Sequence, residues 1–284
     1  MFVVAAESYD RFMGRYSVPL APVFVEFAGV AEGQRVLDVG CGPGALTAEL
    51  VRRLGPASVT AVDPSEPFVA AARERHPEVN VERASAEDLP FPDGAFDAAL
   101  AQLVVHFMTD PVAGLHEMAR VTRDEGVLAA CVWDHAEGGH GPLSVFWEAA
   151  TEVDPGREDE SLLAGARSGH LTELFDAAGI HDVEEGPITV SIEHPTFEEW
   201  WEPFTLGVGP AGVYAAGLDP ERQAALRESC RAKLPPAPFV ATVRAWSARG
   251  RTYRSADVLH PADEATAVAN LASQMGAVRS VGNA

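Results

Sequence analysis

The sequence predicts a doubly wound α/β fold built on a mostly parallel sheet. Five short apolar runs follow one another between residues 35 and 133, and helical patterns separate most of them. Short buried strands that alternate with helices are typical of a parallel sheet covered on both faces. With 47% hydrophobic residues and a mean hydropathy near zero, the chain can also bury a full core.

The elements of the first half are expected in a regular order. A leading helical region at 8–28 is expected to be interrupted near Pro19 and Pro22, since proline lacks a backbone donor. The expected strands are 35–39, 58–62, 79–84, 96–103 and 126–133. The helical patterns between them are 44–54, 66–76 and 111–123.

The second half is less regular. A helix at 143–153 and a polar connection precede a second helix near 170–178, which Gly179 closes. An extended run at 180–194 and an alternating run at 239–250 complete seven strands, and the alternation of the last run is typical of an edge strand. The segment between them is aromatic, then glycine-rich, then helical. We therefore expect a core of residues 1–194 and 238–260, an inserted helical lid at 195–237 and a tail at 261–284.

Charge and cysteine content restrict the function classes. Twenty-one basic against 42 acidic residues give a formal charge of −21, which disfavours nucleic acid and anionic lipid as partners. Three widely spaced cysteines fit a reducing compartment without a disulfide framework. The first ten residues lack the basic start of a signal peptide, and no run is long enough to span a bilayer. We expect a cytoplasmic protein, monomeric or homodimeric, without a membrane partner.

A glycine turn at the end of the first strand predicts a nucleotide-like ligand. In "RVLDVGCGPGALTAEL", Gly40, Gly42 and Gly44 leave backbone N–H groups open at the start of the next helix. The spacing also satisfies the dinucleotide pattern, so the glycines alone leave the ligand open. Asp38 favours one answer. Its carboxylate would repel a pyrophosphate but attract a ligand with an ammonium group and a sulfonium, such as S-adenosylmethionine.

Two later segments extend this site. Asp63 ends the second strand, where an acid accepts hydrogen bonds from ribose hydroxyls in either ligand class. The segment "ASAEDLPFPDGAFDAAL" follows the third strand. There Ala86 leaves room for an adenine ring, and Glu87 or Asp88 can accept from its amine.

These motifs resemble those of class I S-adenosylmethionine-dependent methyltransferases, in the ubiquinone/menaquinone-type (type 11) group. The matching segments are "VLDVGCGPG", "VTAVDPS" and the run from "ASAEDLPF" to "CVW", and the resemblance covers about residues 8–134. It implies a Rossmann-like seven-stranded sheet with an antiparallel last strand. It also implies S-adenosylmethionine as cofactor, with S-adenosylhomocysteine as product.

The resemblance assigns cofactor contacts residue by residue. Asp38, Gly40 and Gly42 would surround the methionine moiety, with Cys41 and Gly44 in the same turn. The remaining implied contacts are Asp63, Pro64, Ser65 and Phe68 at the ribose and adenine, Ala86 and Glu87 at the adenine, Gln102 and Leu103 beside the methyl group, and Tyr9, Arg15 and Tyr16 over the cofactor. The chain departs from many relatives in having Ser85 in place of an aspartate, which shifts the adenine contact toward Glu87.

The acceptor site is expected in the segments outside the common core. His106, just beyond the fourth strand, is the candidate general base, with packing as the alternative role. The candidate substrate-pocket residues are His106, His135, Trp147, Trp200 and Trp201. A metal site at Asp134, His135 and His140 is disfavoured, because histidines beside glycines in loops are usually solvated.

The predicted function is therefore methyl transfer to a small, partly hydrophobic metabolite, with oxygen or carbon weakly favoured over nitrogen as the acceptor atom. Two alternatives stay open at this point. One is a non-catalytic S-adenosylmethionine-binding protein, and the other is an NAD-dependent oxidoreductase on a Rossmann fold.

Overall fold

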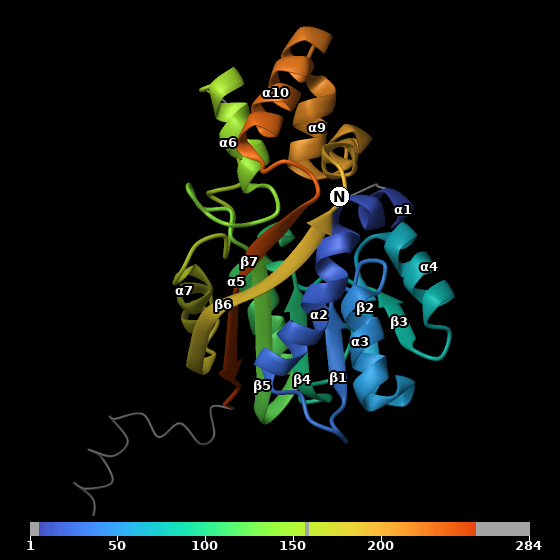
Figure 1. The fold of residues 1–284 in the computed structure, drawn as a ribbon. Helices are drawn as coiled ribbons and strands as arrows, with labels where there is room; N and C mark the ends of the chain where they lie inside the picture. Colours follow the sequence, from blue (N-terminus) through green and yellow to red (C-terminus); the bar gives the residue numbers. More distant parts are fainter. Residues whose placement is uncertain (1–5, 157–158, 254–284) are drawn as a thin grey trace, which may run out of the picture. The chain divides into compact units, whose positions relative to one another are not determined.

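A seven-stranded sheet forms the centre of the computed structural model, which describes residues 6–156 and 159–253 (Figure 1). Its strand order is β3-β2-β1-β4-β5-β7-β6. Strands β1 to β5 pair in parallel, and β7 runs antiparallel to both β5 and β6. The strands are β1 (Val36–Val39), β2 (Val59–Asp63), β3 (Asn80–Arg83), β4 (Phe96–Gln102), β5 (Thr122–Trp133), β6 (His181–His194) and β7 (Phe239–Arg251).

Helices cover both faces of the sheet, as the apolar runs predict. The helical elements up to β5 are α1 (Ala6–Tyr9), the π-helical turn η1 (Asp10–Gly14), α2 (Arg15–Ala28), α3 (Ala45–Leu54), the 3-10 turn η2 (Pro56–Ser58), α4 (Glu66–Arg75), the 3-10 turn η3 (Val105–Phe107) and α5 (Pro111–Val121). Those beyond β5 are α6 (Ser144–Val153), α7 (His170–Ala177), α8 (Phe197–Trp201), the 3-10 turn η4 (Glu202–Leu206), α9 (Gly209–Gly217) and α10 (Pro220–Lys233).

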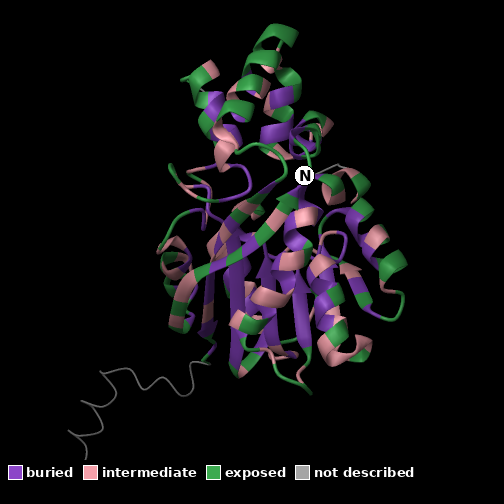
Figure 2. Cartoon of the chain, in the orientation of Figure 1, coloured by how far each residue is buried: buried purple, intermediate pink, exposed green. Residues whose placement is uncertain are grey.

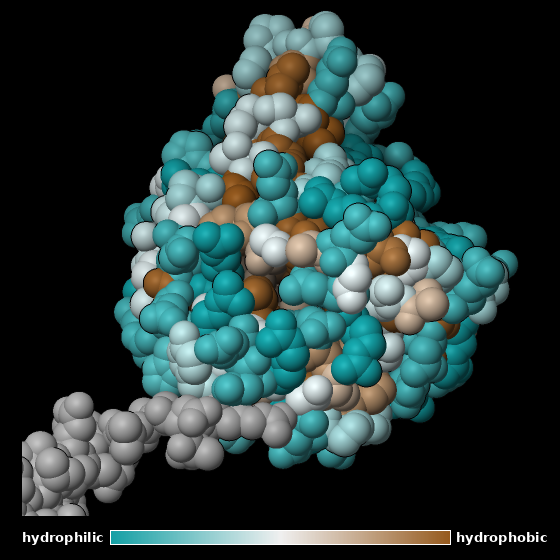
Figure 3. Space-filling view, turned by 90° about the horizontal axis from the view of Figure 1, so that it is seen from below, coloured by the Kyte–Doolittle hydropathy of each residue, from teal (hydrophilic) through white to brown (hydrophobic). Residues whose placement is uncertain are grey.

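Alternate residues of β1 belong to two apolar cores. Val36 packs in the core that includes Phe24 of α2 and Leu50 of α3, whereas Leu37 packs with Leu115 of α5 and Phe175 of α7. Figure 2 shows the consequence, since the central strands β1, β2 and β4 are buried almost throughout and the helices expose their outer faces. Figure 3 shows a face of the molecule on which hydrophilic residues predominate.

Two local predictions are wrong. Helix α2 continues through Pro19 and Pro22, because its buried face packs along the sheet. The irregular part of the leading region is the π-helical turn η1, which precedes α2. Strand β7 is an inner strand, not an edge strand. Its polar side chains are accommodated by ion pairs of Arg244 with Asp134 and of Arg249 with Glu184.

The segment between β6 and β7 folds into α8, η4, α9 and α10. Helix α10 packs against α6, and Figure 1 shows both, with α9, beyond the end of the sheet toward which β6 points. We keep the name lid for residues 195–237. Within the described residues, no helix is long and apolar enough to cross a membrane. The predicted tail at 261–284 lies outside the described residues.

Candidate functional site

The glycine turn connects β1 to α3 in a conformation that needs glycine. Gly40, Gly42 and Gly44 have φ values of +70°, +53° and +100°. A Cβ on Gly40 would lie 2.5 Å from the Val104 side chain, and one on Gly44 would lie 2.8 Å from His76. A Cβ on Gly42 would have no atom of the described residues within 4 Å beyond its chain neighbours. Gly42 therefore faces open space. Positions 40 and 44, in contrast, need glycine both for their positive φ and for the close packing of Val104 and His76.

Asp38 is a buried carboxylate beside this turn. It is 1% exposed, and its Oδ2 accepts a hydrogen bond from the Thr47 hydroxyl at 2.6 Å. Burial raises the pKa of Asp38 to about 7, the Thr47 hydrogen bond opposes this, and the nearby charge of Asp63 adds to it. Within the described ranges no basic side chain forms an ion pair with Asp38. A cationic ligand group would therefore stabilise its charged form.

Asp63 ties the end of β2 to the glycine turn. Its Oδ2 accepts the Gly42 N–H at 2.9 Å, and its Oδ1 accepts the Ser65 N–H at 2.8 Å. Burial still raises the pKa of this carboxyl, although both backbone hydrogen bonds lower it. Each oxygen has a second lone pair for a ligand hydroxyl. The sequence indicated the ligand contact but not this bracing of the turn.

The loop after β3 is fixed by Glu87. One Glu87 oxygen accepts from the Ser85 hydroxyl at 2.8 Å, and the other accepts from the Thr109 N–H at 2.8 Å. Burial raises the pKa of Glu87, but the hydrogen bonds outweigh it and the net shift is downward. Glu87 therefore joins the two loops that border the site. Ala86 lies between them with its side chain buried, whereas Asp88 is exposed.

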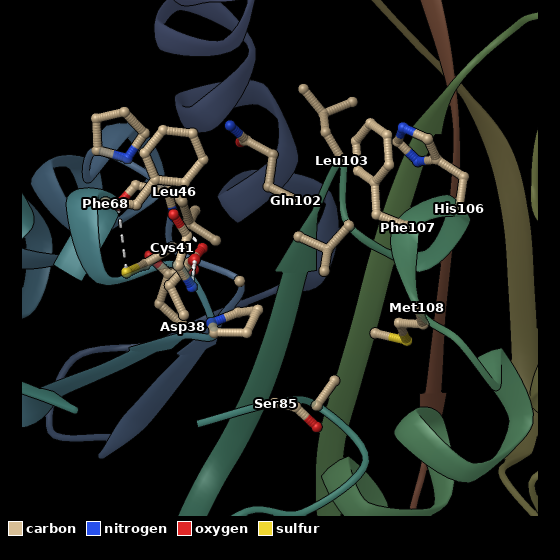
Figure 4. A pocket seen from close by; sticks show the side chains of 18 of the residues that line it. Asp38, Cys41, Leu46, Phe68, Ser85, Gln102, Leu103, His106, Phe107 and Met108 are labelled. Atoms are coloured by element: carbon tan, nitrogen blue, oxygen red, sulfur yellow. Dashed lines mark hydrogen bonds between the residues drawn. The ribbon is translucent and has the colours of Figure 1, made fainter. Parts of the chain in front are cut away.

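These elements surround a cavity of about 870 Å³ (Figure 4). In the figure, Asp38, Cys41 and Phe68 lie on one side, and Leu103, His106, Phe107 and Met108 lie on the other. Predicted residues that line the cavity are Tyr9, Asp38, Gly40, Cys41, Gly42, Asp63, Pro64, Ser65, Phe68, Ala86, Glu87, Gln102, Leu103 and His106. The wall also includes residues that the sequence did not single out, among them Leu46, Val104, Phe107, Met108 and Ala113.

Three predicted cofactor residues lie outside this lining. Gly44 caps the start of α3 and contacts His76. Arg15 donates to the Glu199 carbonyl at 2.8 Å, which joins α2 to the lid. Tyr16 is buried against Trp133, with its hydroxyl 3.3 Å from His194 Nε2. These two side chains connect the leading helix to neighbouring elements, while Tyr9 lines the cavity and packs against Phe68.

Leu103 and His106 form the wall beyond β4. Leu103 adopts the left-handed region at φ +63°, which is strained for a non-glycine residue and is common at functional sites. The His106 ring lies 6.0 Å from the His135 ring, measured between centroids. Burial lowers the pKa of His106 well below its usual value, and lowers that of His135 to about 4. Both imidazoles are therefore neutral near pH 7.

The predicted pocket tryptophans lie behind the site. Trp200 and Trp201 are 3% and 7% exposed and pack with Phe204 inside the lid. Phe204 in turn stacks on Phe146 of α6 at 4.5 Å. None of the three predicted tryptophans lines the large cavity, because aromatic packing buries them. The Trp147 indole N–H donates a hydrogen bond to the buried carboxyl group of Glu160 at 2.7 Å.

The loop after β5 is organised by Asp134. Its carboxylate forms an ion pair with Arg244 at 2.6 Å and accepts hydrogen bonds from the His140 N–H and from the Trp246 indole. The His140 ring lies 3.3 Å from the Arg244 guanidinium. Through these contacts, Asp134 and His140 hold the loop against β7.

Fold and site together define the class of protein. The strand order with an antiparallel β7, and the glycine turn between the acids that end β1 and β2, are those of a class I S-adenosylmethionine-dependent methyltransferase. Residues 37–130 match the family model described as a methyltransferase domain. The chain is an S-adenosylmethionine-dependent methyltransferase, and the family match over residues 37–130 is to the type 11 group. This class membership supports the methyltransferase interpretation over the oxidoreductase and non-catalytic alternatives.

Curated relatives agree with this membership. An uncharacterized protein of Mycobacterium tuberculosis is 28% identical over 229 residues, which cover 76% of this chain and 82% of the relative. A fatty-acid O-methyltransferase of Mycolicibacterium smegmatis is 39% identical over 116 residues, 40% of this chain and 42% of the relative. A ubiquinone/menaquinone biosynthesis C-methyltransferase of Bdellovibrio bacteriovorus is 32% identical over 134 residues, 44% of this chain and 57% of the relative.

A solved structure supports the fold alone. The YcgJ protein of Bacillus subtilis superimposes with a TM-score of 0.54 at 18% identity, covering 84% of this chain and 99% of that chain.

Proposed function

We propose that this methyltransferase binds S-adenosylmethionine in the large cavity and methylates a small, partly hydrophobic metabolite, at oxygen or carbon rather than nitrogen. When bound, S-adenosylmethionine supplies a methyl group on a positively charged sulfur. The observation that supports the site is the pair of buried acids. Asp38 has no cationic partner in the described part of the chain, and Asp63 keeps lone pairs free beside a left-handed glycine turn.

The residues present fit this cofactor. Asp38 would hold the cationic amino-acid end, and Asp63 would accept hydrogen bonds from the ribose hydroxyls. Ala86 and Phe68 offer small and aromatic surfaces to the adenine, and both line the cavity. The glycine turn keeps Cβ atoms away from the ligand at Gly42.

A small apolar acceptor is favoured by the way the cavity is enclosed. Leu103, Phe107 and Met108 border it beyond β4, and a neighbouring hollow shares Tyr9, Leu103, His106 and Phe107 with it. Apolar walls with few polar groups are typical of small-molecule sites. Holding the acceptor in line and away from water would supply much of the rate enhancement, on the order of 7–11 kcal/mol in favourable cases.

His106 is the residue that would accept a proton from an acceptor hydroxyl. It lines both the large cavity and the hollow, and its imidazole is neutral near pH 7. The fatty-acid O-methyltransferase and the ubiquinone/menaquinone C-methyltransferase among the relatives are compatible with either acceptor atom.

The test is methyl transfer from radiolabelled S-adenosylmethionine to matched acceptors that offer a phenol, an activated carbon or an amine on the same apolar ring. The proposal expects label on the oxygen or carbon acceptors. Label on the amine alone would contradict it.

A further inference from the structure

A hollow of about 30 Å³ adjoins the large cavity. Both are lined by Tyr9, Leu103, His106 and Phe107, so the hollow extends the cavity away from the glycine turn. Its remaining lining residues are Phe12, Met13, Trp133, His135, Leu143, Glu160, Val208, Gly209 and Pro210. They come from η1, the end of β5, the segments beside α6 and the start of α9, which the fold brings together.

The walls of the hollow are mostly apolar, but three buried polar atoms of its lining residues have no hydrogen-bond partner among the described residues. Trp133 is 2% exposed, and its Nε1 is buried without a hydrogen-bond partner among the described residues. The same holds for Nδ1 of His106 and Nδ1 of His135, within that part of the chain. Native proteins pair most buried polar groups, so three unpaired atoms on residues of one hollow indicate a ligand group.

Glu160 adds a carboxyl group to the same wall. It is 4% exposed, and its Oε2 accepts the Trp147 indole N–H at 2.7 Å. In residues 6–156 and 159–253, no basic side chain forms an ion pair with it. Glu160 therefore supplies an acceptor that is fixed in position by a side chain behind the wall.

The donor and acceptor types select one kind of ligand group. The Trp133 indole can only donate. Burial raises the pKa of Glu160 to about 7, so its carboxyl accepts when ionised and can also donate when protonated. Each neutral imidazole Nδ1 donates or accepts, depending on the tautomer. A hydroxyl both donates and accepts, so it matches the set. A ligand carboxylate would be repelled by the ionised form of Glu160, and an ammonium group cannot accept from Trp133.

We propose that the hollow is the subsite for a hydroxyl group of an apolar methyl acceptor, recognised by Trp133, His135 and Glu160. The inference rests on the proposed function, because it places the acceptor next to the cofactor cavity. It goes further than the proposed function by naming the polar group that the acceptor must carry, a hydroxyl, and the residues that recognise this hydroxyl.

The test compares phenol with toluene on the protein saturated with S-adenosylhomocysteine. Both probes fit an apolar site, and only phenol has the hydroxyl. Calorimetric titration should show phenol binding about 5-fold more tightly, since one net hydrogen bond is worth roughly 1 kcal/mol. In a ¹⁵N-labelled sample, phenol should move the indole N–H signal of Trp133, which the Trp133→Phe variant identifies by its disappearance.

Two further variants make the result specific. Glu160→Gln should weaken phenol binding about 5-fold and leave toluene unchanged, since the amide still accepts from Trp147. Glu137→Gln, an exposed acid on the loop after β5, is the matched control and should change neither. Retained affinity for S-adenosylhomocysteine shows that each variant is folded.

The outcomes separate the two proposals. Equal affinities for phenol and toluene, or a Trp133 signal that does not move with phenol, would overturn the hydroxyl subsite. Failure of the unaltered protein to bind S-adenosylhomocysteine would instead contradict the proposed function.

Discussion

The Asp63 carboxylate accepts a hydrogen bond from the Gly42 backbone N–H at 2.9 Å, which joins the carboxyl end of β2 to the glycine turn after β1. The same side chain also accepts the Ser65 N–H. One acid therefore fixes two loops of the cofactor site, in addition to any contact with a ribose.

Asp63→Asn should weaken cofactor binding and lower stability together. The amide has one acceptor oxygen, so one of the two backbone N–H groups would face an NH₂ group. Leaving one such donor unpaired costs about 1–3 kcal/mol. Urea unfolding should show a loss in this range, and calorimetry should show at least about a 10-fold loss of S-adenosylmethionine affinity. Asp88→Asn, an exposed acid nearby, is the control; equal behaviour of the two variants would refute the bracing role.

Gly40→Ala should destabilise the protein more than Gly42→Ala. Both positions have positive φ, which costs roughly 1–2 kcal/mol for an alanine. Only at Gly40 would the new methyl meet Val104, at 2.5 Å, and such overpacking adds about 1–3 kcal/mol. Equilibrium unfolding of the two variants measures the difference. Equal losses would show that the packing at Gly40 relaxes without cost.

Asp38 should make the ligand-free protein less stable as the pH rises. Its pKa is raised to about 7 in the folded state by burial, against 3.8 as the ordinary value. Its stabilising contribution is therefore full below about pH 4 and is lost as the pH rises through 7, by about 4 kcal/mol at most. The difference in unfolding free energy between the wild type and Asp38→Asn should fall between pH 4 and 7 and then level off. A difference that is constant across this range would contradict the prediction.

His106→Asn should reduce turnover of a phenolic acceptor by about 10²–10⁴-fold while changing S-adenosylmethionine affinity much less. Burial lowers the pKa of His106 well below 6.5, so the imidazole stays neutral as the pH falls through 6.5. The wild-type rate should therefore not drop on this account between pH 8 and pH 6. Unchanged turnover in the variant would assign His106 to packing alone.

Sequence patterns predicted the sheet well, because buried parallel strands are short apolar runs. Each of β1 to β4 begins and ends within about two residues of its predicted range. Strand β5 begins four residues before its predicted start, where Thr122 follows α5 directly and the polar residues up to Gly126 give no strand signal. Helix α9 gave no helical signal either, because Gly209 and Gly212 are poor helix formers.

The acceptor side of the site was less predictable. Trp133 reads as part of an apolar strand, and Glu160 as part of a polar connection; only the folded chain brings both to one hollow. Conversely, Trp200 and Trp201 suggested a pocket because of their size and proximity, but the lid buries them against Phe204. Local patterns describe a strand or a turn, whereas a cavity wall depends on contacts between distant segments.

The most direct test is calorimetric titration of the wild type and of Asp38→Asn with S-adenosylmethionine and, separately, with NADH. The proposed cofactor site predicts that the wild type binds S-adenosylmethionine and not NADH. It also predicts that removing the charge of Asp38 lowers that affinity by at least about 10-fold, since hydrogen bonds to charged groups are worth roughly 1.5–3 kcal/mol. Binding of NADH alone, or undiminished S-adenosylmethionine affinity in the variant, would contradict it.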